Sequence, residues 1–376
     1  MLKVLINASN LHNGGGVQVA TSFIFEFYKK NIHSRNIFFW VSSEVDNNLS
    51  EMEVDTSNFL NYRVVNTYGF GFLMSSFRHE LDSFDVVFTL FGPLYILNRN
   101  FFNITGFAQA WIAYPDNEFY GHLPLSRKLL LRLKFYIQCW FFRRADKLLV
   151  ELEHVRIALI KRGIIQADGV DVVHNCLSSL YFEPKLWRKI EFPNFSPNVL
   201  KLGYLGRDYS HKNTKILPLI VKELRNKYGV DSRLFVTFTE NEWRSCSSEF
   251  REFTINVGSL SVSECPTFYQ NVDAIVFPSL LECFSATPLE AMVMKKPLFV
   301  SDRPFNKDLC GDNAFYFDPL DAQSAASKIF EVWQKNMVDA GFLERARKYA
   351  ILFSSPEKRA ESYLDIINNS LKNCKK

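Results

Sequence analysis

The chain has 376 residues, of which 47% are hydrophobic and 22% charged, and its formal net charge is +4. This composition is typical of a globular protein with full cores, and it excludes a disordered chain, a collagen-like repeat and a small disulfide scaffold. At ~150 residues per domain the length predicts about two domains, and the small net charge gives no indication of a nucleic-acid partner.

The first residues, MLKVLINAS, form an apolar run that Lys3 and Asn7 interrupt, so we expect no secretory signal. No stretch approaches the ~18 uninterrupted apolar residues that span a bilayer. The seven cysteines are scattered and form no Cys-x-x-Cys pair, which predicts reduced thiols. We therefore expect a cytoplasmic protein, either soluble or peripheral on a membrane.

In the first half, short apolar runs alternate with longer amphipathic runs, which predicts βα units and a parallel sheet. The expected strands are 3–9, 36–43, 62–68, 85–90, 105–110, 146–151 and 170–175. The first strand leads into Gly14, Gly15 and Gly16 and then into an amphipathic helix. These glycines would let the backbone approach a ligand closely, although a tight strand-to-helix turn explains them equally well.

Residues 125–147 form a second distinctive segment, with seven Lys or Arg, one Asp and many Leu and aromatic residues. The run is helical in character and too charged to span a membrane. It suits an anionic membrane surface, and a packed helix with one basic face is the alternative.

The second half repeats the alternation after residues 186–199, which lose periodicity, contain two prolines and are predicted to be a linker. Its expected strands are 200–205, 233–239, 273–278, 297–301 and 314–317, and residues 342–372 are expected to be helical. We predict an α/β protein with two doubly wound domains, at 1–190 and 200–350. A C-terminal helix at 351–376 would pack back on the first domain. Ligands of such folds bind at the carboxyl ends of the strands, and a cleft between two domains is the expected site.

Several common catalytic signatures are missing. The chain has no Gly-x-Ser-x-Gly, no P-loop, no zincin helix after His79-Glu80 and no Gly-x-Gly-x-x-Gly after its first strand. Their absence disfavours an α/β-hydrolase, a P-loop ATPase, a zinc protease and a nicotinamide dehydrogenase. A strict Asp-x-Asp is absent too, so we expect no metal and no cofactor, and cationic side chains would have to neutralise any diphosphate.

The most informative segment follows the strand at 273–278. Glu282 lies in a loop and Glu290 in the first turn of the next helix, so both carboxylates can face one ligand. Carboxylates there could accept hydrogen bonds from sugar or ribose hydroxyls. For Glu290 the alternative is a capping box with Thr287.

A second segment follows the strand at 200–205, where Gly206-Arg207 ends the strand and a polar loop brings Lys212 to the next helix. An Arg fork and a compact Lys charge together suit a diphosphate. An ordinary solvated loop is the alternative.

In this order and at these distances, Gly14–Gly16, Gly206-Arg207…Lys212-Asn213 and Glu282…Glu290 resemble a GT-B glycosyltransferase of glycosyltransferase family four. The overall character is similar to bacterial enzymes that build O-antigen or other surface polysaccharides. This resemblance implies two Rossmann-like domains that face each other across a cleft. It also implies retention of anomeric configuration, with the leaving phosphate as base and no protein nucleophile.

The resemblance also implies roles for individual residues. Arg207 and Lys212 would hold the donor diphosphate and stabilise the leaving group, Glu282 would bind the donor sugar and Glu290 the ribose. The remaining donor-binding residues would be Gly14, Gly15, Gly16, Gly206, Phe284, Ser285, Ala286 and Thr287. The family usually has glycine where this chain has Cys283, Ser285 and Lys295, so the donor sugar cannot be inferred.

The first-domain histidine that many relatives place near the donor sugar has no clear equivalent, and Gln109 or Trp111 would occupy that region. Asp116 and His122 are further sugar-side candidates. The resemblance thus implies a metal-independent, retaining glycosyltransferase that uses a nucleotide sugar and a saccharide or polyprenyl-linked acceptor. One alternative is a GT-B-like nucleotide-sugar epimerase using Asp116, Glu118 and His122, and another is a non-catalytic nucleotide-sugar or lipid-binding module.

Overall fold

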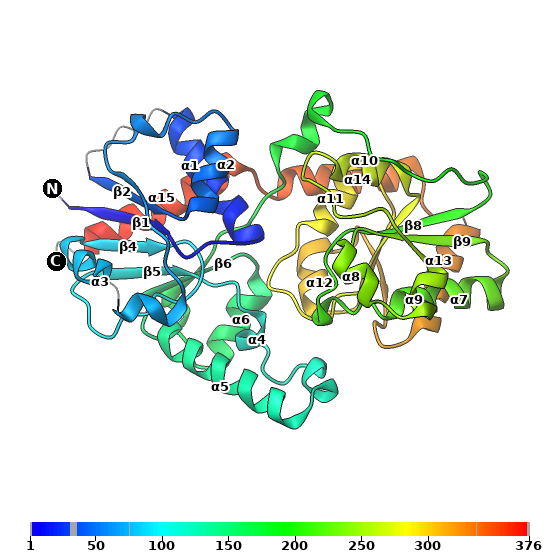
Figure 1. The fold of residues 1–376 in the computed structure, drawn as a ribbon, viewed down its shortest axis with the longest axis horizontal. Coiled ribbons are helices and arrows are strands. Elements are labelled where there is room, and N and C mark those ends of the chain that lie inside the picture. The colour runs from blue at the N-terminus through cyan, green and yellow to red at the C-terminus, as the bar shows by residue number, and fades with distance from the viewer. Residues whose placement is uncertain (1, 31–35, 75, 336, 374–376) are drawn as a thin grey trace. The chain divides into compact units, whose positions relative to one another are not determined.

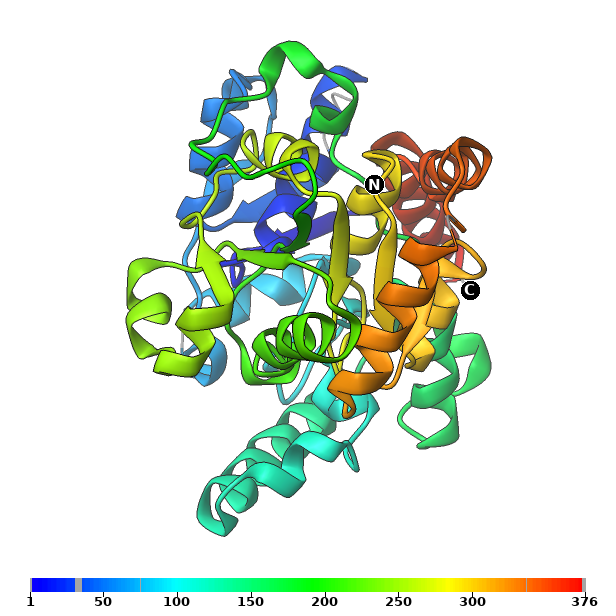
Figure 2. The ribbon, with the colours of Figure 1, turned by 90° about the vertical axis from the view of Figure 1, so that its right-hand side faces the viewer.

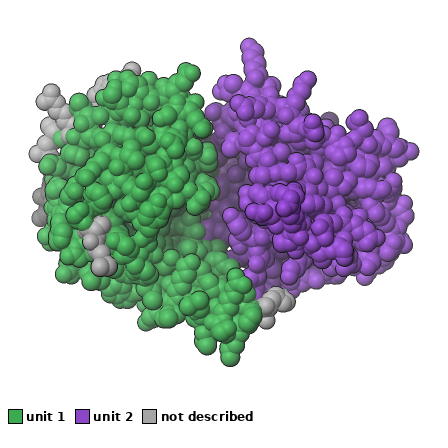
Figure 3. Space-filling model, in the orientation of Figure 1, with its two compact units in different colours: residues 1–116, 123–175, 355–376 green, residues 117–122, 176–354 purple. Residues whose placement is uncertain are grey.

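The computed structural model describes residues 2–30, 36–74, 76–335 and 337–373, and it divides into two compact units (Figures 1 and 3). Unit 1 consists of Met1–Asp116, Leu123–Asn175 and Ser355–Lys376, and unit 2 of Asn117–His122 and Cys176–Ser354. The C-terminal segment thus returns to the unit in which the chain begins, and the division falls after Asn175.

Unit 1 is built on a seven-stranded sheet in the order β3-β2-β1-β4-β5-β6-β7, in which every pair is parallel. Its strands are β1 (Val4–Ala8), β2 (Ile37–Val41), β3 (Tyr62–Val64), β4 (Val86–Thr89), β5 (Phe102–Gly106), β6 (Lys147–Val150) and β7 (Val170–Val172). The chain builds outward from β1 to β3 and then returns to add β4 on the other side of β1. The carboxyl ends of β1 and β4 therefore mark the point where the strand order reverses, which is where doubly wound sheets bind ligands.

The helices of unit 1 are α1 (Gly15–Lys29), α2 (Ser43–Glu51), α3 (Phe77–Glu80), α4 (Ala110–Ala113), α5 (Leu125–Phe142), α6 (Glu153–Lys161) and α15 (Pro356–Asn373). Helix α15 packs on α1, and both lie against the core (Figure 1). The ring of Phe23 in α1 lies 5.1 Å from that of Tyr363 in α15, which in turn lies 5.1 Å from Phe88 in β4. The last helix is therefore an integral part of the core of unit 1.

Unit 2 is built on a six-stranded parallel sheet in the order β10-β9-β8-β11-β12-β13. Its strands are β8 (Leu200–Tyr204), β9 (Ser232–Val236), β10 (Thr254–Asn256), β11 (Ala274–Phe277), β12 (Leu298–Ser301) and β13 (Phe315–Phe317). Its helices are α7 (Ile216–Tyr228), α8 (Glu240–Ser245), α9 (Ser248–Phe253), α10 (Cys265–Asn271), α11 (Thr287–Val293), α12 (Pro304–Cys310), α13 (Ala322–Gln334) and α14 (Ala340–Phe353). Helices α7 and α13 lie side by side on one face of this sheet (Figure 2). The two parallel sheets confirm the predicted doubly wound α/β class.

Three details of the sequence-based prediction are wrong. Strand β10 was missed, because three residues at a sheet edge are too short to show alternation. Strand β5 begins at Phe102, three residues earlier than predicted. The C-terminal segment is not one helix, since α14 ends at Phe353 and Pro356 begins α15, where the hydroxyl of Ser355 accepts a hydrogen bond from the Lys358 N–H.

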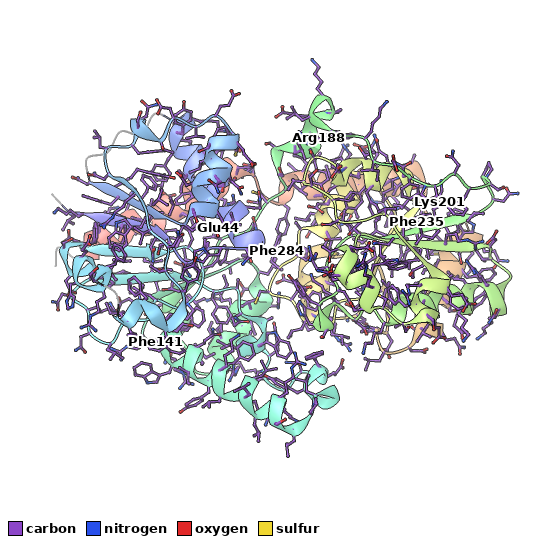
Figure 4. The ribbon with its side chains drawn as sticks, viewed as in Figure 1. Glu44, Phe141, Arg188, Lys201, Phe235 and Phe284 are labelled. Carbon is purple, nitrogen blue, oxygen red and sulfur yellow. The ribbon has the colours of Figure 1, made fainter. Side chains whose placement is uncertain are left out.

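The predicted linker has no helix or strand over residues 187–199, as expected. The segment is nevertheless packed on unit 2 (Figure 4, in which Arg188 and Phe235 are labelled). The ring of Phe192 lies 4.3 Å from that of Phe235 in β9, and the Arg188 N–H donates to the Ser263 carbonyl at 2.8 Å. The loss of periodicity in the sequence therefore indicated an irregular backbone. It did not indicate a free linker, because this segment packs on unit 2.

Candidate functional site

The two informative segments of the second half meet at the carboxyl edge of the sheet of unit 2. Strands β8 and β11 are neighbours, and the strand order reverses between them as it does between β1 and β4. The loop after β8 contains the short 3-10 helix Ser210–Lys212, and the loop after β11 leads into α11. The Leu280 N–H donates to the carbonyl of His211 at 2.8 Å, so the two loops are hydrogen-bonded to each other.

Lys212 and Glu282 form a close ion pair at this edge. The ammonium of Lys212 lies 2.6 Å from Glu282 Oε1, which also accepts from Ser279 Oγ at 2.6 Å. Both charged side chains are mostly buried, with 17% and 10% of their surfaces exposed. The ammonium has three donors, so the pair fixes Lys212 in position and leaves it capacity to bind an anion.

Burial also affects the neighbouring histidine. It lowers the pKa of His211, an effect that the charge of Lys212 reinforces and the charge of Glu282 opposes. The His211 imidazole is therefore favoured in its neutral form beside the ion pair.

Arg207 is held differently. Its Nε donates to Glu242 Oε1 at 3.0 Å, while its two terminal nitrogens have no partner among the described residues. Gly206, directly before it, has a φ of +155°, and a Cβ there would lie 3.0 Å from the hydroxyl of Tyr204. A side chain at position 206 would therefore crowd Tyr204 in an unfavourable backbone conformation, and the glycine leaves the fork of Arg207 open.

Glu242 was not predicted from the sequence as a site residue, although it belongs to a recognisable capping motif. Thr239 and Glu242 form a capping box at the start of α8. Burial alone would raise the pKa of Glu242, but hydrogen bonds from Thr239, Arg207 and the Asp208 N–H lower it below the ordinary value. The carboxylate therefore stays ionised and orients Arg207.

Glu290 is not part of a capping box, so that alternative is wrong: α11 has Ala286 at its N-cap and no capping hydrogen bond from a side chain. Instead, Glu290 Oε2 accepts a hydrogen bond from the Tyr269 hydroxyl at 2.8 Å. Burial raises the pKa of Glu290, and the hydrogen bond from Tyr269 offsets part of that shift. This half-buried carboxyl group is held by Tyr269 in a fixed position, from which it can bind a polar ligand.

The other donor-side candidates of unit 2 line the loop that precedes α11. Phe284, which is labelled in Figure 4, Ser285 and Ala286 are half-buried, and Thr287 is buried. Their contact with a donor stays a prediction.

The first-half candidates lie at separate places. Gly14, Gly15 and Gly16 form the turn between β1 and α1, and Gly14 has a φ of +71° that favours glycine. A Cβ on Gly14 or Gly15 would meet nothing within 4 Å. Gln109 lies at the N-cap of α4, and the ring of Trp111 stacks on Phe135 in α5 at 5.6 Å.

The two acidic candidates of the epimerase alternative belong to different units and have different partners. Asp116 is 91% exposed, and one of its oxygens lies 3.9 Å from Arg132. Glu118 belongs to unit 2, where Arg303 donates to both of its oxygens at 2.8 and 2.6 Å. His122 ends the turn Glu118–His122, and its side chain lies outside the described part of the structure.

The described residues contain no group of three or more His, Cys, Asp or Glu side chains that could hold a metal ion. Their six cysteines, at positions 139, 176, 246, 265, 283 and 310, are free.

Comparison with known proteins agrees with this geometry. Residues 187–351, which include Arg207, Lys212, Glu282 and Glu290, match the family model "Glycosyl transferases group 1". This part of the chain, 187–351, is thus similar to a group 1 glycosyltransferase domain. The predicted enzyme class is thereby confirmed for the domain that carries the charged site.

Among curated proteins, the chain is 31% identical over 86 residues to the O-antigen chain mannosyltransferase RfbU of Salmonella typhimurium. That similarity covers 23% of this chain and 24% of the relative.

Among solved structures, a glycosyltransferase from Rickettsia africae aligns with a TM-score of 0.69 and 17% identity over 99% of both chains. Anabaena Alr3699/HepE in complex with UDP-glucose aligns with a TM-score of 0.68 and 12% identity, over 98% of this chain and 100% of that one. These similarities show the fold, which is GT-B as predicted.

Proposed function

We propose that the protein is a retaining, metal-independent glycosyltransferase of family four that moves a sugar from a nucleotide diphosphate to a saccharide acceptor. The observation that carries the proposal is the Lys212–Glu282 pair at the reversal point of the sheet of unit 2, beside the open fork of Arg207. It is supported by the group 1 domain over residues 187–351.

The two cations account for catalysis. As the bond between sugar and diphosphate breaks, negative charge develops on the leaving oxygen, and fixed donors near it stabilise the transition state. Glu242 orients Arg207, and Glu282 with Ser279 positions Lys212. Neither cation has to reorganise when the charge appears.

The two carboxylates account for donor recognition. Glu282 would accept hydrogen bonds from donor-sugar hydroxyls while it holds Lys212. Glu290 would accept them from the ribose, since its position is already fixed by Tyr269. Buried, fully oriented acceptors discriminate strongly for a ligand that donates to them.

With Glu282 paired to Lys212 and assigned to the sugar hydroxyls, the proposal gives no residue the role of nucleophile, and attack would come from the face that the leaving group occupies, with the departing phosphate as base. Such a route retains the anomeric configuration. Charge neutralisation by Arg207 and Lys212 makes a divalent cation unnecessary.

The first test is calorimetric titration of the purified chain with UDP, GDP and NAD in the presence of EDTA. Tight binding of one nucleoside diphosphate supports the proposal and identifies the donor base, whereas binding of NAD alone would overturn it. Turnover with the matching nucleotide sugar should survive EDTA, and the anomeric proton of the product reports retention. A strict Mg²⁺ or Mn²⁺ requirement would contradict the metal-free site.

For the acceptor, our proposal is guided by similarity. The Salmonella relative is named an O-antigen chain mannosyltransferase, so mannosyl transfer to a polyprenyl-linked or free O-antigen-type saccharide is the first reaction to assay. Conversion of the donor to its epimer, without acceptor, would instead support the epimerase alternative.

We also propose that the protein works at the cytoplasmic face of an anionic membrane, through α5. Leu125, Leu129, Leu133 and Tyr136 are each 58–73% exposed, and their spacing places them on one face of the helix. The helix carries four basic residues and no acidic one. Figure 2 shows it extending away from the sheet of unit 1. An exposed apolar stripe flanked by cations is typical of a helix that lies in an anionic interface.

No helix among the described residues is long and apolar enough to cross a membrane. If α5 docks on an anionic surface, flotation with vesicles that contain phosphatidylglycerol should recover the protein in a salt-sensitive way, and phosphatidylcholine vesicles should not. Leu129→Glu with Leu133→Glu should abolish flotation, and Leu352→Glu, at a position 71% exposed on α14, should not. Equal recovery of all variants would contradict membrane docking.

A further inference from the structure

A pocket of about 480 Å³ lies at the amino edge of the sheet of unit 2, and all of its lining residues belong to that unit. Leu200 and Ala274, which begin β8 and β11, line it together with Pro297, which directly precedes β12. Arg207 and Lys212 follow the opposite end of β8, a strand of five residues that each advance the chain by ~3.3 Å. This amino-edge pocket is therefore separate from the charged site at the carboxyl edge.

Most of the lining of the amino-edge pocket is apolar. Nine of its twelve lining residues are apolar, and α13 contributes three of them, Ile329, Val332 and Trp333. Phe299 of β12 and Leu343 of α14 are also among them. A volume within ~300–1,000 Å³ and an apolar lining with a few polar groups are typical of a small-molecule site. The pocket therefore suits a ligand with an apolar body.

Trp333 offers such a body an open aromatic surface. The residue lines the pocket and is 51% exposed. Among the residues that the structure describes, its ring contacts no other ring and its indole N–H has no hydrogen-bond partner. Aromatic side chains contribute strongly to binding because each buries a large apolar area. A ligand that covers Trp333 would therefore gain much of its binding free energy from this contact.

The three charged residues of the lining are two lysines and one aspartate. The ammonium of Lys295 is paired with Glu344 at 2.9 Å. Asp273 Oδ2 accepts from the Lys201 N–H at 2.8 Å, and its Oδ1 lies 3.8 Å from the ammonium of Lys201, which is labelled in Figure 4. The carboxylate of Asp273 is therefore already engaged by Lys201.

Lys296 is the remaining charge, and it has no carboxylate of its own. The residue is half-buried, and its ammonium donates to the Gln270 carbonyl at 3.5 Å, which is the outer limit of a hydrogen bond. Burial lowers the pKa of Lys296, the charge of Asp273 opposes this shift and the charge of Lys201 reinforces it. An ammonium group has three donors, so Lys296 can bind an anion at the wall of the apolar pocket.

We propose that the amino-edge pocket binds a small amphipathic anion, whose aliphatic body covers Trp333 and whose carboxylate or phosphate is bound by Lys296. The net charge of the lining, one aspartate against two lysines, favours an anion over a neutral or cationic ligand. The anionic group could be that of a free fatty acid or of an alkyl phosphate, since both present charged oxygens to an ammonium group. The inference goes beyond the proposed function, because it concerns the opposite edge of the sheet.

Calorimetric titration of the full chain with octanoate and octyl phosphate tests the proposal, with octanol and octyltrimethylammonium as matched neutral and cationic probes below their micellar concentrations. At least one anion should bind ~10-fold more tightly than octanol, as expected for hydrogen bonds to a charged group. Lys296→Ala should remove this difference and leave the affinity for octanol unchanged. Trp333→Ala should weaken the binding of both anions by ~10-fold, as for the exposure of one large apolar side chain. The tighter of the two anions identifies the head group.

Two variants of α7 are the matched controls. Lys222→Ala removes a surface lysine, and Leu219→Ala changes a position that is 40% exposed, so both should bind the anions normally. The double variant Leu129→Glu with Leu133→Glu should also bind them, because α5 is not part of the pocket. Since Trp333 is exposed and Lys296 is half-buried, their variants should fold.

The proposal is overturned if neither anion binds, if octanol binds as tightly as the anions, or if Lys296→Ala keeps the difference between them. Saturating UDP or GDP should leave the Kd of the anion unchanged. Displacement by a nucleotide would instead assign the anion to the charged site at the carboxyl edge. Because the titration needs no nucleotide and no turnover, failure of the proposed function would leave this result intact.

Discussion

The two units share a strand topology and differ in what they place at its reversal point. In unit 2 the carboxyl ends of β8 and β11 carry Lys212, Glu282 and Arg207, all charged. In unit 1 the ends of β1 and β4 open into a pocket lined by amides and aromatic rings. The same backbone therefore presents a charged surface in one unit and a neutral pocket lined by amides and aromatic rings in the other. Function is determined by the loops and not by the sheet.

The largest expected effect is the loss of Lys212. Lys212→Ala removes a fixed cation from the place where leaving-group charge develops, and we expect turnover to fall by ~100- to 1,000-fold, as for loss of one oxyanion donor. Initial rates with the matching nucleotide sugar measure it. Lys222→Ala, which removes a surface lysine paired with Glu249, should keep the full rate. A Lys212→Ala enzyme of unchanged rate would mean that unit 2 holds its donor without this charge.

The next prediction concerns a buried carboxyl group of unit 1 that does not line the neutral pocket. Glu151, beyond the end of β6, accepts from Asn175 Nδ2 at 2.7 Å, and Arg359 of α15 donates to the same amide. Burial raises the pKa of Glu151 to about 7, an effect that the Asn175 hydrogen bond and the Arg359 charge oppose. The folded protein therefore holds a proton that the unfolded chain releases near pH 4.5.

The difference in the pKa of Glu151 between the folded and unfolded states determines how stability changes with pH. The stability that Glu151 contributes is fully present below pH 4.5 and is lost as the pH rises through about 7. Glu151→Gln cannot titrate, so its thermal midpoint relative to the unmodified protein should rise between pH 5 and pH 8. The corresponding free energy is at most about 3 kcal/mol. Glu361→Gln, an exposed carboxylate of α15, is the control, and parallel pH profiles for all three proteins would refute the assignment.

A smaller effect is expected at Glu290. Glu290→Gln keeps an oxygen that can accept from Tyr269 but removes the charge, and we expect the Kd of the nucleoside diphosphate to rise ~10-fold, within the range for hydrogen bonds to a charged group. Calorimetry measures this Kd. The exposed Glu249→Gln serves as the control, and a Kd unchanged in Glu290→Gln would show that this carboxyl serves only the packing of Tyr269.

The charged surface could be found from the sequence because its parts lie in short, local motifs. Arg207 and Lys212 lie in one loop, and Glu282 and Glu290 flank another, so each pair could be found locally. The resemblance to a known family joined the two pairs, and the pairing of β8 with β11 brings their loops to one sheet edge. The neutral pocket could not be found in this way. Asn10, Tyr68, Gln109 and Gln138 come from four distant segments of ordinary composition, and only the fold brings them together.

The smallest expected effect concerns the backbone at Lys295. Its φ is +55°, in the left-handed region that costs a residue with a Cβ roughly 1–2 kcal/mol. Glycine would relieve this strain, but it would also give the unfolded chain more conformational freedom, which lowers stability by about 0.4–1 kcal/mol. The exposed pair of Lys295 with Glu344, at 2.9 Å, contributes little. Lys295→Gly should therefore stabilise the protein by at most about 1 kcal/mol, seen as a small rise in thermal midpoint. Lys295→Ala keeps the strain and loses the pair, so it should show no rise, and equal midpoints for the two variants would show that the backbone is not strained there.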